Sequence, residues 1–148
     1  MSFLSTDPID PVALLDHFTR AATGAGAIVS FTGIVRGDGG VSELWLDHHP
    51  GLTEQSIAAI DAETQARFAV DDLLIVHRIG RVGPGEPVVF LAAAAQHRRA
   101  AFEAVDYAMD RLKTDALLWK RETSGQGARW IEARPQDHDD RARWEERG

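Results

Sequence analysis

Basic side chains with acid–base potential gather in one stretch of the chain, residues 97–122. His97 and Arg98 stand at the start of a predicted helix, Lys113 stands near its end, and Lys120 lies on the strand predicted to follow. The whole chain carries a formal net charge of −7, so this local excess of positive charge stands out. Ammonium, guanidinium and imidazole groups bind anions, and amines and imidazoles can also move protons, which makes the stretch the leading candidate for chemistry.

The start of this predicted helix suits an anion. A helix N-terminus has free N–H groups and a partial positive charge, and both attract phosphate or carboxylate groups. His97 and Arg98 add positive charge at that end, which costs local stability unless an anion lies nearby. The alternative is that both side chains point into water, where surface charges contribute little.

The two lysines offer proton transfer. Strand alternation in LLWKRE puts Leu118 and Lys120 on one face and Trp119 and Arg121 on the other. A lysine among large apolar groups loses water, which lowers its pKa and makes it a usable acid, base or nucleophile. The alternatives are a solvated lysine on an edge strand and, for Lys113, an ordinary lysine favoured by the helix C-terminus.

Strand ends supply further candidates. Arg36 ends the strand predicted at 26–36, and Arg134 ends the last predicted strand; such positions beside loops are common ligand sites. Either arginine can equally be a solvated surface charge. Phe31 is a core residue or, less commonly, a platform for stacking a ring.

A metal site is not expected. His48 and His49 are adjacent on a predicted strand and therefore point to opposite faces. The sequence contains no HExxH spacing. It also contains no cysteine, which excludes disulfides, thiolate metal sites and a cysteine nucleophile.

Composition predicts an ordinary globular protein and argues against binding to duplex nucleic acid. The 148 residues are 44% hydrophobic and 26% charged, as in ordinary globular chains. An acidic chain is a poor duplex nucleic-acid binder, which needs a broad basic face. No apolar run approaches the roughly 20 residues of a membrane span, and no signal peptide is seen, so we expect a cytoplasmic protein.

Hydrophobic periodicity predicts one α+β domain over residues 1–148, built from repeated helix–strand–strand units with mostly antiparallel hairpins. The glycine-rich turn at 37–40 is expected to join two strands as a hairpin, and strand 87–95 is expected to be buried on both faces. Residues 1–9 are expected to be flexible, and 136–148 to be flexible or a short surface helix. The predicted helices cover 11–24, 53–69 and 97–113, the first capped by Asp10 and the second by Thr53, and the predicted strands cover 26–36, 42–48, 73–79, 87–95, 117–123 and 129–134.

Six segments resemble, in order and spacing, the large catalytic subunit of molybdopterin synthase. They are SFTGIVRG (30–37), LDHHPG (46–51), HRIGRVGPGE (77–86), QHRRAAFEA (96–104), MDRLKTDALLWKRE (109–122) and RWIEAR (129–134). The resemblance implies an α/β hammerhead-type fold and a homodimer that binds two small ubiquitin-like subunits, giving a heterotetramer. It implies a sulfurtransferase that converts cyclic pyranopterin monophosphate to molybdopterin, with sulfur delivered as the thiocarboxylate on the small subunit's C-terminal Gly-Gly. No cofactor is implied.

The resemblance also implies roles for individual residues. Lys113 and Lys120 match the active-site lysines, and some of the site is expected to come from the neighbouring subunit of the dimer. The remaining substrate-binding positions that match are Phe31, Ile34, Val35, Arg36, His97, Arg98, Met109, Arg121, Glu122 and Arg134.

Two departures from the family pattern concern local geometry. Ala94 and Ala95 replace a serine that would cap the following helix, and Leu117 replaces a proline that would stiffen the strand entry. The competing reading from the residues alone is a non-catalytic module that binds a phosphorylated ligand or holds a partner's tail, because the same cations serve it.

Overall fold

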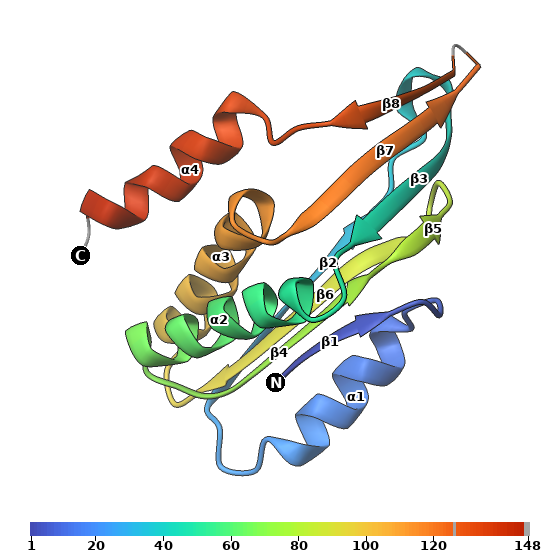
Figure 1. The fold of residues 1–148 in the computed structure, drawn as a ribbon. Helices are drawn as coiled ribbons and strands as arrows, with labels where there is room; N and C mark the ends of the chain where they lie inside the picture. Colours follow the sequence, from blue (N-terminus) through green and yellow to red (C-terminus); the bar gives the residue numbers. More distant parts are fainter. Residues whose placement is uncertain (126, 147–148) are drawn as a thin grey trace.

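Two mainly antiparallel sheets build the molecule (Figure 1). The structure is a computed structural model and describes residues 1–125 and 127–146. The first sheet has the strand order β1-β4-β6-β2 and the second the order β5-β3-β7-β8; only the β1–β4 pair is parallel. The strands are β1 (Ser2–Ser5), β2 (Ala27–Ile34), β3 (Val41–His48), β4 (Val70–Arg78), β5 (Gly80–Val82), β6 (Pro87–Ala95), β7 (Leu118–Ser124) and β8 (Gly127–Ile131).

Strand β6 is the centre of the first sheet, and its small side chains let helices pack on both of its faces. Residues 89–95 are all buried, as the apolar run predicted. Leu91 and Ala93 face helices α2 and α3, whereas Phe90 and Ala92 face helix α1. The helices are α1 (Pro11–Ala21), α2 (Leu52–Arg67), α3 (Arg98–Thr114) and α4 (Pro135–Glu146), and α4 packs on α3.

The second sheet leans away from these helices (Figure 1). Leu44 and Leu46 of β3 form a small separate core with Val35 and Val82. Strand β7 lies between β3 and β8, so it is an interior strand.

The entry to β7 is fastened by hydroxyl groups of α2. The Thr53 hydroxyl donates to the Leu117 carbonyl at 2.7 Å, and the Leu117 N–H donates to the Ser56 hydroxyl at 3.1 Å. A proline at 117 would have no N–H for the second bond. These two hydrogen bonds therefore hold the start of β7, the strand that carries Lys120, although a proline is absent at position 117.

The α+β class with mainly antiparallel pairing is confirmed. Most of the predicted helices are also present at the expected positions. Asp10 caps α1 as predicted, accepting the Ala13 N–H at 3.1 Å. Helix α2 begins earlier than expected, because Gly51 and not Thr53 is its N-cap. Thr53 is a buried helical residue whose hydroxyl is used in the contact to Leu117.

The predicted hairpin between residues 26–36 and 42–48 is wrong. Strand β2 pairs with β6 in the first sheet, and β3 pairs with β5 and β7 in the second. The short 3-10 helix η1 (Asp38–Gly40), with positive φ at Gly39 and Gly40, leads the chain from one sheet to the other. Each strand buries its apolar residues in a different core, which outweighs local pairing.

The N-terminal segment is more ordered than expected, and the C-terminal segment forms the helix that was one of its two predicted alternatives. Residues 2–5 form β1, parallel to β4, with Leu4 packed against the core below α2 and α3. Residues 135–146 form α4, which places Trp144 at 3% exposure. Neither segment has a long apolar period, so local patterns did not indicate these packed positions.

Candidate active site

A cavity of about 660 Å³ lies between the inner face of the second sheet, the C-terminal end of α3 and the start of α4. Strand β2 ends at its rim, and β4 contributes to its wall. The cavity brings together eight of the twelve residues expected at the site: Ile34, Val35, Arg36, Met109, Lys113, Lys120, Glu122 and Arg134. Residues from β2, α3, β7 and the segment after β8 thus meet there, although they are far apart in sequence.

Lys120 is the desolvated lysine that strand alternation predicted. Its register partners across the sheet are Leu46 and Ile131, both apolar, and its strand is interior. Burial, helped by the charge of Lys113 and opposed by the charge of Asp137, lowers the pKa of Lys120 to about 8. An amine with a pKa of about 8 exchanges protons readily near neutral pH.

Lys113 approaches the same cavity from the last turn of α3. The helix C-terminus favours its positive charge. These two residues are the only lysines in the 148-residue sequence, and both line the cavity. An amine pair of this kind can hold an anion and also donate or accept a proton.

His77 also lines the cavity and was not among the expected site residues. It is 5% exposed on β4, and its Nδ1 lies 2.7 Å from the Arg78 carbonyl oxygen. Since a carbonyl only accepts, Nδ1 carries the proton and Nε2 keeps the lone pair. Burial lowers the pKa of His77 to about 4, helped by the charges of Lys120 and Lys113, so the ring is neutral at physiological pH. A single histidine in an apolar strand resembles a core residue, which is why sequence reasoning passed over it.

Asp137 is the second residue that sequence reasoning missed, because its segment was expected to be flexible or a short surface helix. It is 8% exposed in the first turn of α4 and lines the cavity. Its carboxylate accepts the Arg134 N–H at 2.9 Å and lies 3.3 Å from the Arg134 guanidinium. The cavity therefore holds a buried carboxylate as well as two amines.

Ion pairs neutralise the charged groups nearer the rim. Arg36 lies 3.6 Å from Asp38, and Arg129 lies 3.3 Å from Glu122. Both arginines are largely exposed, at 79% and 80% of the side chain, so an incoming anion can compete for them.

Four expected residues do not line this cavity within one chain. His97 and Arg98 are exposed at the start of α3, and Arg98 lies about 22 Å along the helix axis from Lys113 at 1.5 Å per residue. Phe31 is 39% exposed on β2. Arg121 lies on the outer face of the second sheet, 6.0 Å from the Trp45 ring and 5.8 Å from the Trp130 ring. Their contribution from a neighbouring subunit stays a prediction.

Among residues 1–125 and 127–146, no three His, Asp or Glu side chains are grouped so that they could hold a metal ion. No helix in that same part of the chain has the length and apolar character needed to cross a membrane.

Because His77 is neutral in the fold, we expect the free energy of unfolding to depend on pH in the acid range. As pH falls from 6.5 to about 4, the unfolded chain takes up a proton at His77 and the folded chain does not. The free energy of unfolding should therefore decrease over this window, with His77 contributing about 3 kcal/mol of the decrease. We expect His77→Gln to show a shallower decrease in urea unfolding between pH 7 and pH 4.

The exposed His17 supplies the control for that measurement. His17→Gln removes a histidine from the surface of α1 and should leave the wild-type pH dependence in place. Equal slopes for His77→Gln and wild type would mean that His77 is not neutral in the fold.

Comparison with known proteins places these features in context. A family model described as MoaE protein matches residues 4–115. The chain is 45% identical over 140 residues to the molybdopterin synthase catalytic subunit of Pseudomonas aeruginosa, covering 93% of each chain. It is 42% identical over 142 residues to that of Cereibacter sphaeroides, covering 95% of this chain and 97% of the relative. The solved structure of a molybdopterin biosynthesis MoaE protein from Burkholderia ambifaria matches with a TM-score of 0.84 and 38% identity, over 98% of this chain and 97% of the other.

Proposed function

This chain belongs to the MoaE family of molybdopterin synthase catalytic subunits, and from that premise we propose that its cavity is the site of sulfur transfer. The substrate is cyclic pyranopterin monophosphate, and the product is molybdopterin with its dithiolene. Sulfur arrives as a thiocarboxylate on the C-terminus of a small ubiquitin-like subunit. The observation that carries the proposal is the convergence of the chain's two lysines on one cavity, one of them desolvated.

The charges of the cavity suit both anionic reactants. A phosphate at the rim can engage Arg36 and Arg134, whose guanidinium groups are exposed and lie beside the cavity. A thiocarboxylate tail that enters deeper meets the amines of Lys113 and Lys120. The absence of cysteine from the chain agrees with sulfur that is supplied by a partner.

The amines can act in this reaction by stabilising negative charge and by transferring protons. An ammonium beside the thiocarboxylate polarises its carbonyl and stabilises the oxyanion formed during acyl transfer. Lys120, with a pKa of about 8, can also donate and recover a proton while the pterin ring opens. The neutral Nε2 of His77 offers a third position for a proton in the cavity wall.

We also propose that the active form is a homodimer carrying two small subunits. Phe31, His97 and Arg98 do not line the cavity of their own chain, and a neighbouring subunit could bring them to it. Mixing inactive Lys120→Ala with inactive His97→Ala chains should then restore part of the activity, because one site in a mixed dimer has all its residues. If the mixture is as inactive as each variant alone, the active site is not built from residues of two subunits.

The experiment that tests the function is a defined reconstitution. Purified protein is incubated with a thiocarboxylated small subunit and the cyclic pterin precursor, and the dithiolene product is detected by mass spectrometry. A small subunit with an ordinary C-terminal carboxylate serves as the control. Binding of the pterin or of the tail without product would favour the non-catalytic alternative. Cell fractionation tests the cytoplasmic location that belongs to the same proposal.

A further inference from the structure

The buried carboxylate of Asp137 has two sets of neighbours. On one side, its two oxygens contact the backbone N–H and the guanidinium of Arg134, which caps the first turn of α4. On the other side, it faces the cavity that holds Lys113 and Lys120. Asp137 thus joins the start of a helix to the amine pair.

Asp137 is also the principal negative charge available to those amines. Asp38 pairs with Arg36 and Glu122 with Arg129, both at largely exposed arginines near the rim. Asp137 also pairs with Arg134, but it is buried and its charge acts on Lys120. Of the other ionisable groups that line the cavity, His77 is neutral at physiological pH and Glu132 is exposed. One buried carboxylate, Asp137, therefore shares the cavity with both lysines, of which Lys120 is the desolvated one.

The far half of α4 fixes the position of this carboxylate. Trp144 packs edge-on against Phe68 and Tyr107, with ring centroids 5.8 and 5.5 Å away, and its Nε1 donates to Asp110 at 2.6 Å. The Arg67 guanidinium donates to the Trp144 carbonyl at 2.5 Å. We call these five residues the Trp144 anchor. It ties α4 to α3 and to the end of α2, about 10 Å along the helix from Asp137.

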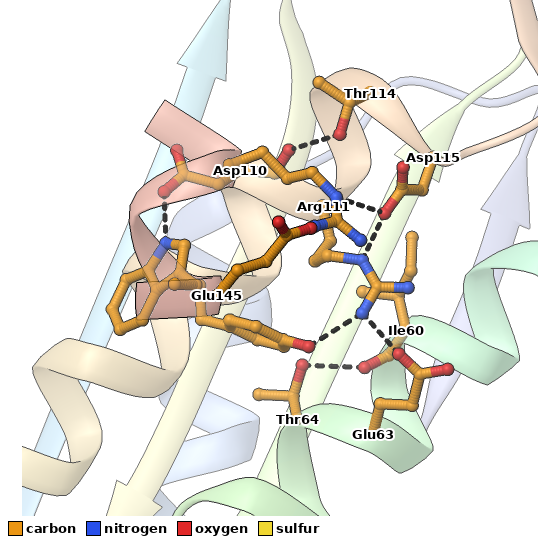
Figure 2. Close-up of polar contacts among 11 residues, drawn as sticks. Ile60, Glu63, Thr64, Asp110, Arg111, Thr114, Asp115 and Glu145 are labelled. Carbon is orange, nitrogen blue, oxygen red and sulfur yellow. Dashed lines mark hydrogen bonds and ion pairs between the residues drawn. The ribbon is translucent and has the colours of Figure 1, made fainter. Parts of the chain in front are cut away.

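Ion pairs brace the surface on which α4 lies. Figure 2 shows Arg111 of α3 between Glu63 of α2 and Asp115 at the end of α3. Arg141 of α4 adds a contact to Asp115 at 3.1 Å, and Arg143 lies 3.0 Å from Asp110. The helix is held mainly through its second half, while its first turn forms part of the cavity wall.

We propose that Asp137 is a positioning residue of the active site, held against the lysine pair by α4 and its Trp144 anchor, and that its charge keeps Lys120 able to carry a proton. The inference deepens the sulfur-transfer role proposed for Lys120 and rests on it. Burial favours the neutral acid of Asp137, but hydrogen bonds from Arg134, with the charge of Lys113, hold its pKa below the ordinary value. The carboxylate is therefore charged throughout the neutral range, and it opposes the lowering of the pKa of Lys120.

A titration of Lys120 tests the proposal without substrate or partner. Reductive methylation with ¹³C-formaldehyde labels the two lysines and the N-terminal amine, and the NMR shift of each methyl group follows the charge of its amine. Asp137→Asn removes the charge but keeps an oxygen that can accept the Arg134 N–H, so the cap of α4 survives. We expect the titration midpoint of Lys120 to move down by about 0.5–1 pH unit in this variant.

Asp139→Asn is the matched control, because it makes the same charge change on an exposed residue of the same helix. It should leave the midpoint of Lys120 at its wild-type value. A midpoint in Asp137→Asn equal to that in Asp139→Asn overturns the proposal.

The role of the anchor is tested by Trp144→Ala, which should release α4 and lower the midpoint of Lys120 as Asp137→Asn does. The double variant should then show no further decrease, since both changes remove the same charge from the cavity. A normal midpoint in Trp144→Ala, with circular dichroism confirming a folded chain, would overturn the anchor's part. Sulfur transfer is measured separately, so a failure of the proposed reaction is distinguishable from a failure of this inference.

Discussion

Replacing Lys120 with alanine is expected to lower the rate of sulfur transfer by about 10²- to 10⁴-fold, the range typical of a lost general acid or base. The amine supplies a proton and a positive charge at the base of the cavity, and none of the apolar residues beside it can do either. The rate is measured as dithiolene formed per minute in the reconstituted system at saturating small subunit.

The fold should survive this change. A partly buried amine costs stability at pH values below its pKa of about 8, so its removal should leave the unfolding midpoint unchanged or higher. Lys120→Arg separates the two functions of the amine, because arginine keeps the charge but does not give up its proton. Turnover by Lys120→Ala near the wild-type rate would exclude the catalytic role and favour a module that only binds.

Replacing Phe90 with alanine should have the largest effect on stability. Phe90 is 1% exposed on the central strand β6 and packs among Phe18, Val76 and Ile9 below α1. Truncating a buried phenylalanine costs about 3–5 kcal/mol, because apolar contacts are lost and a cavity remains. Urea unfolding followed by circular dichroism measures the change in the free energy of unfolding.

Phe102 provides the comparison within the same chain. It is 60% exposed on α3, so Phe102→Ala should change the free energy of unfolding by less than about 1 kcal/mol. Similar losses at both positions would mean that Phe90 does not have the packing described for β6.

Patterns local in sequence predicted much of the fold. The cap at Asp10, the apolar period of α3 and the apolar run of β6 each depend on residues close together, and each agrees with the structure. The strand pairing around residues 37–40 did not follow the local turn signal. Strand β3 instead pairs with β7, some 70 residues later, because long-range burial and not the turn decides the partner.

The site residues divide in the same way, into those that a local sequence pattern predicts and those that depend on long-range packing. Alternation along LLWKRE correctly separated Lys120, which lines the cavity, from Trp119, which is exposed on the other face. His77 and Asp137 gave no such local signal, because their importance depends on which elements surround them. His77 matters because it lines the same cavity as the two lysines, and Asp137 because its helix is held at Trp144.

The restriction of lysine to one cavity has a practical consequence for handling this protein. Reagents that couple to primary amines, such as activated esters used for surface immobilisation, biotin or fluorescent dyes, can react only there or at the N-terminal amine. Near pH 8 a sizeable fraction of Lys120 is unprotonated and therefore nucleophilic. Such conjugation would block the cavity that the label is meant to report on. A cysteine introduced on the exposed face of α1 would give a single attachment point far from the cavity.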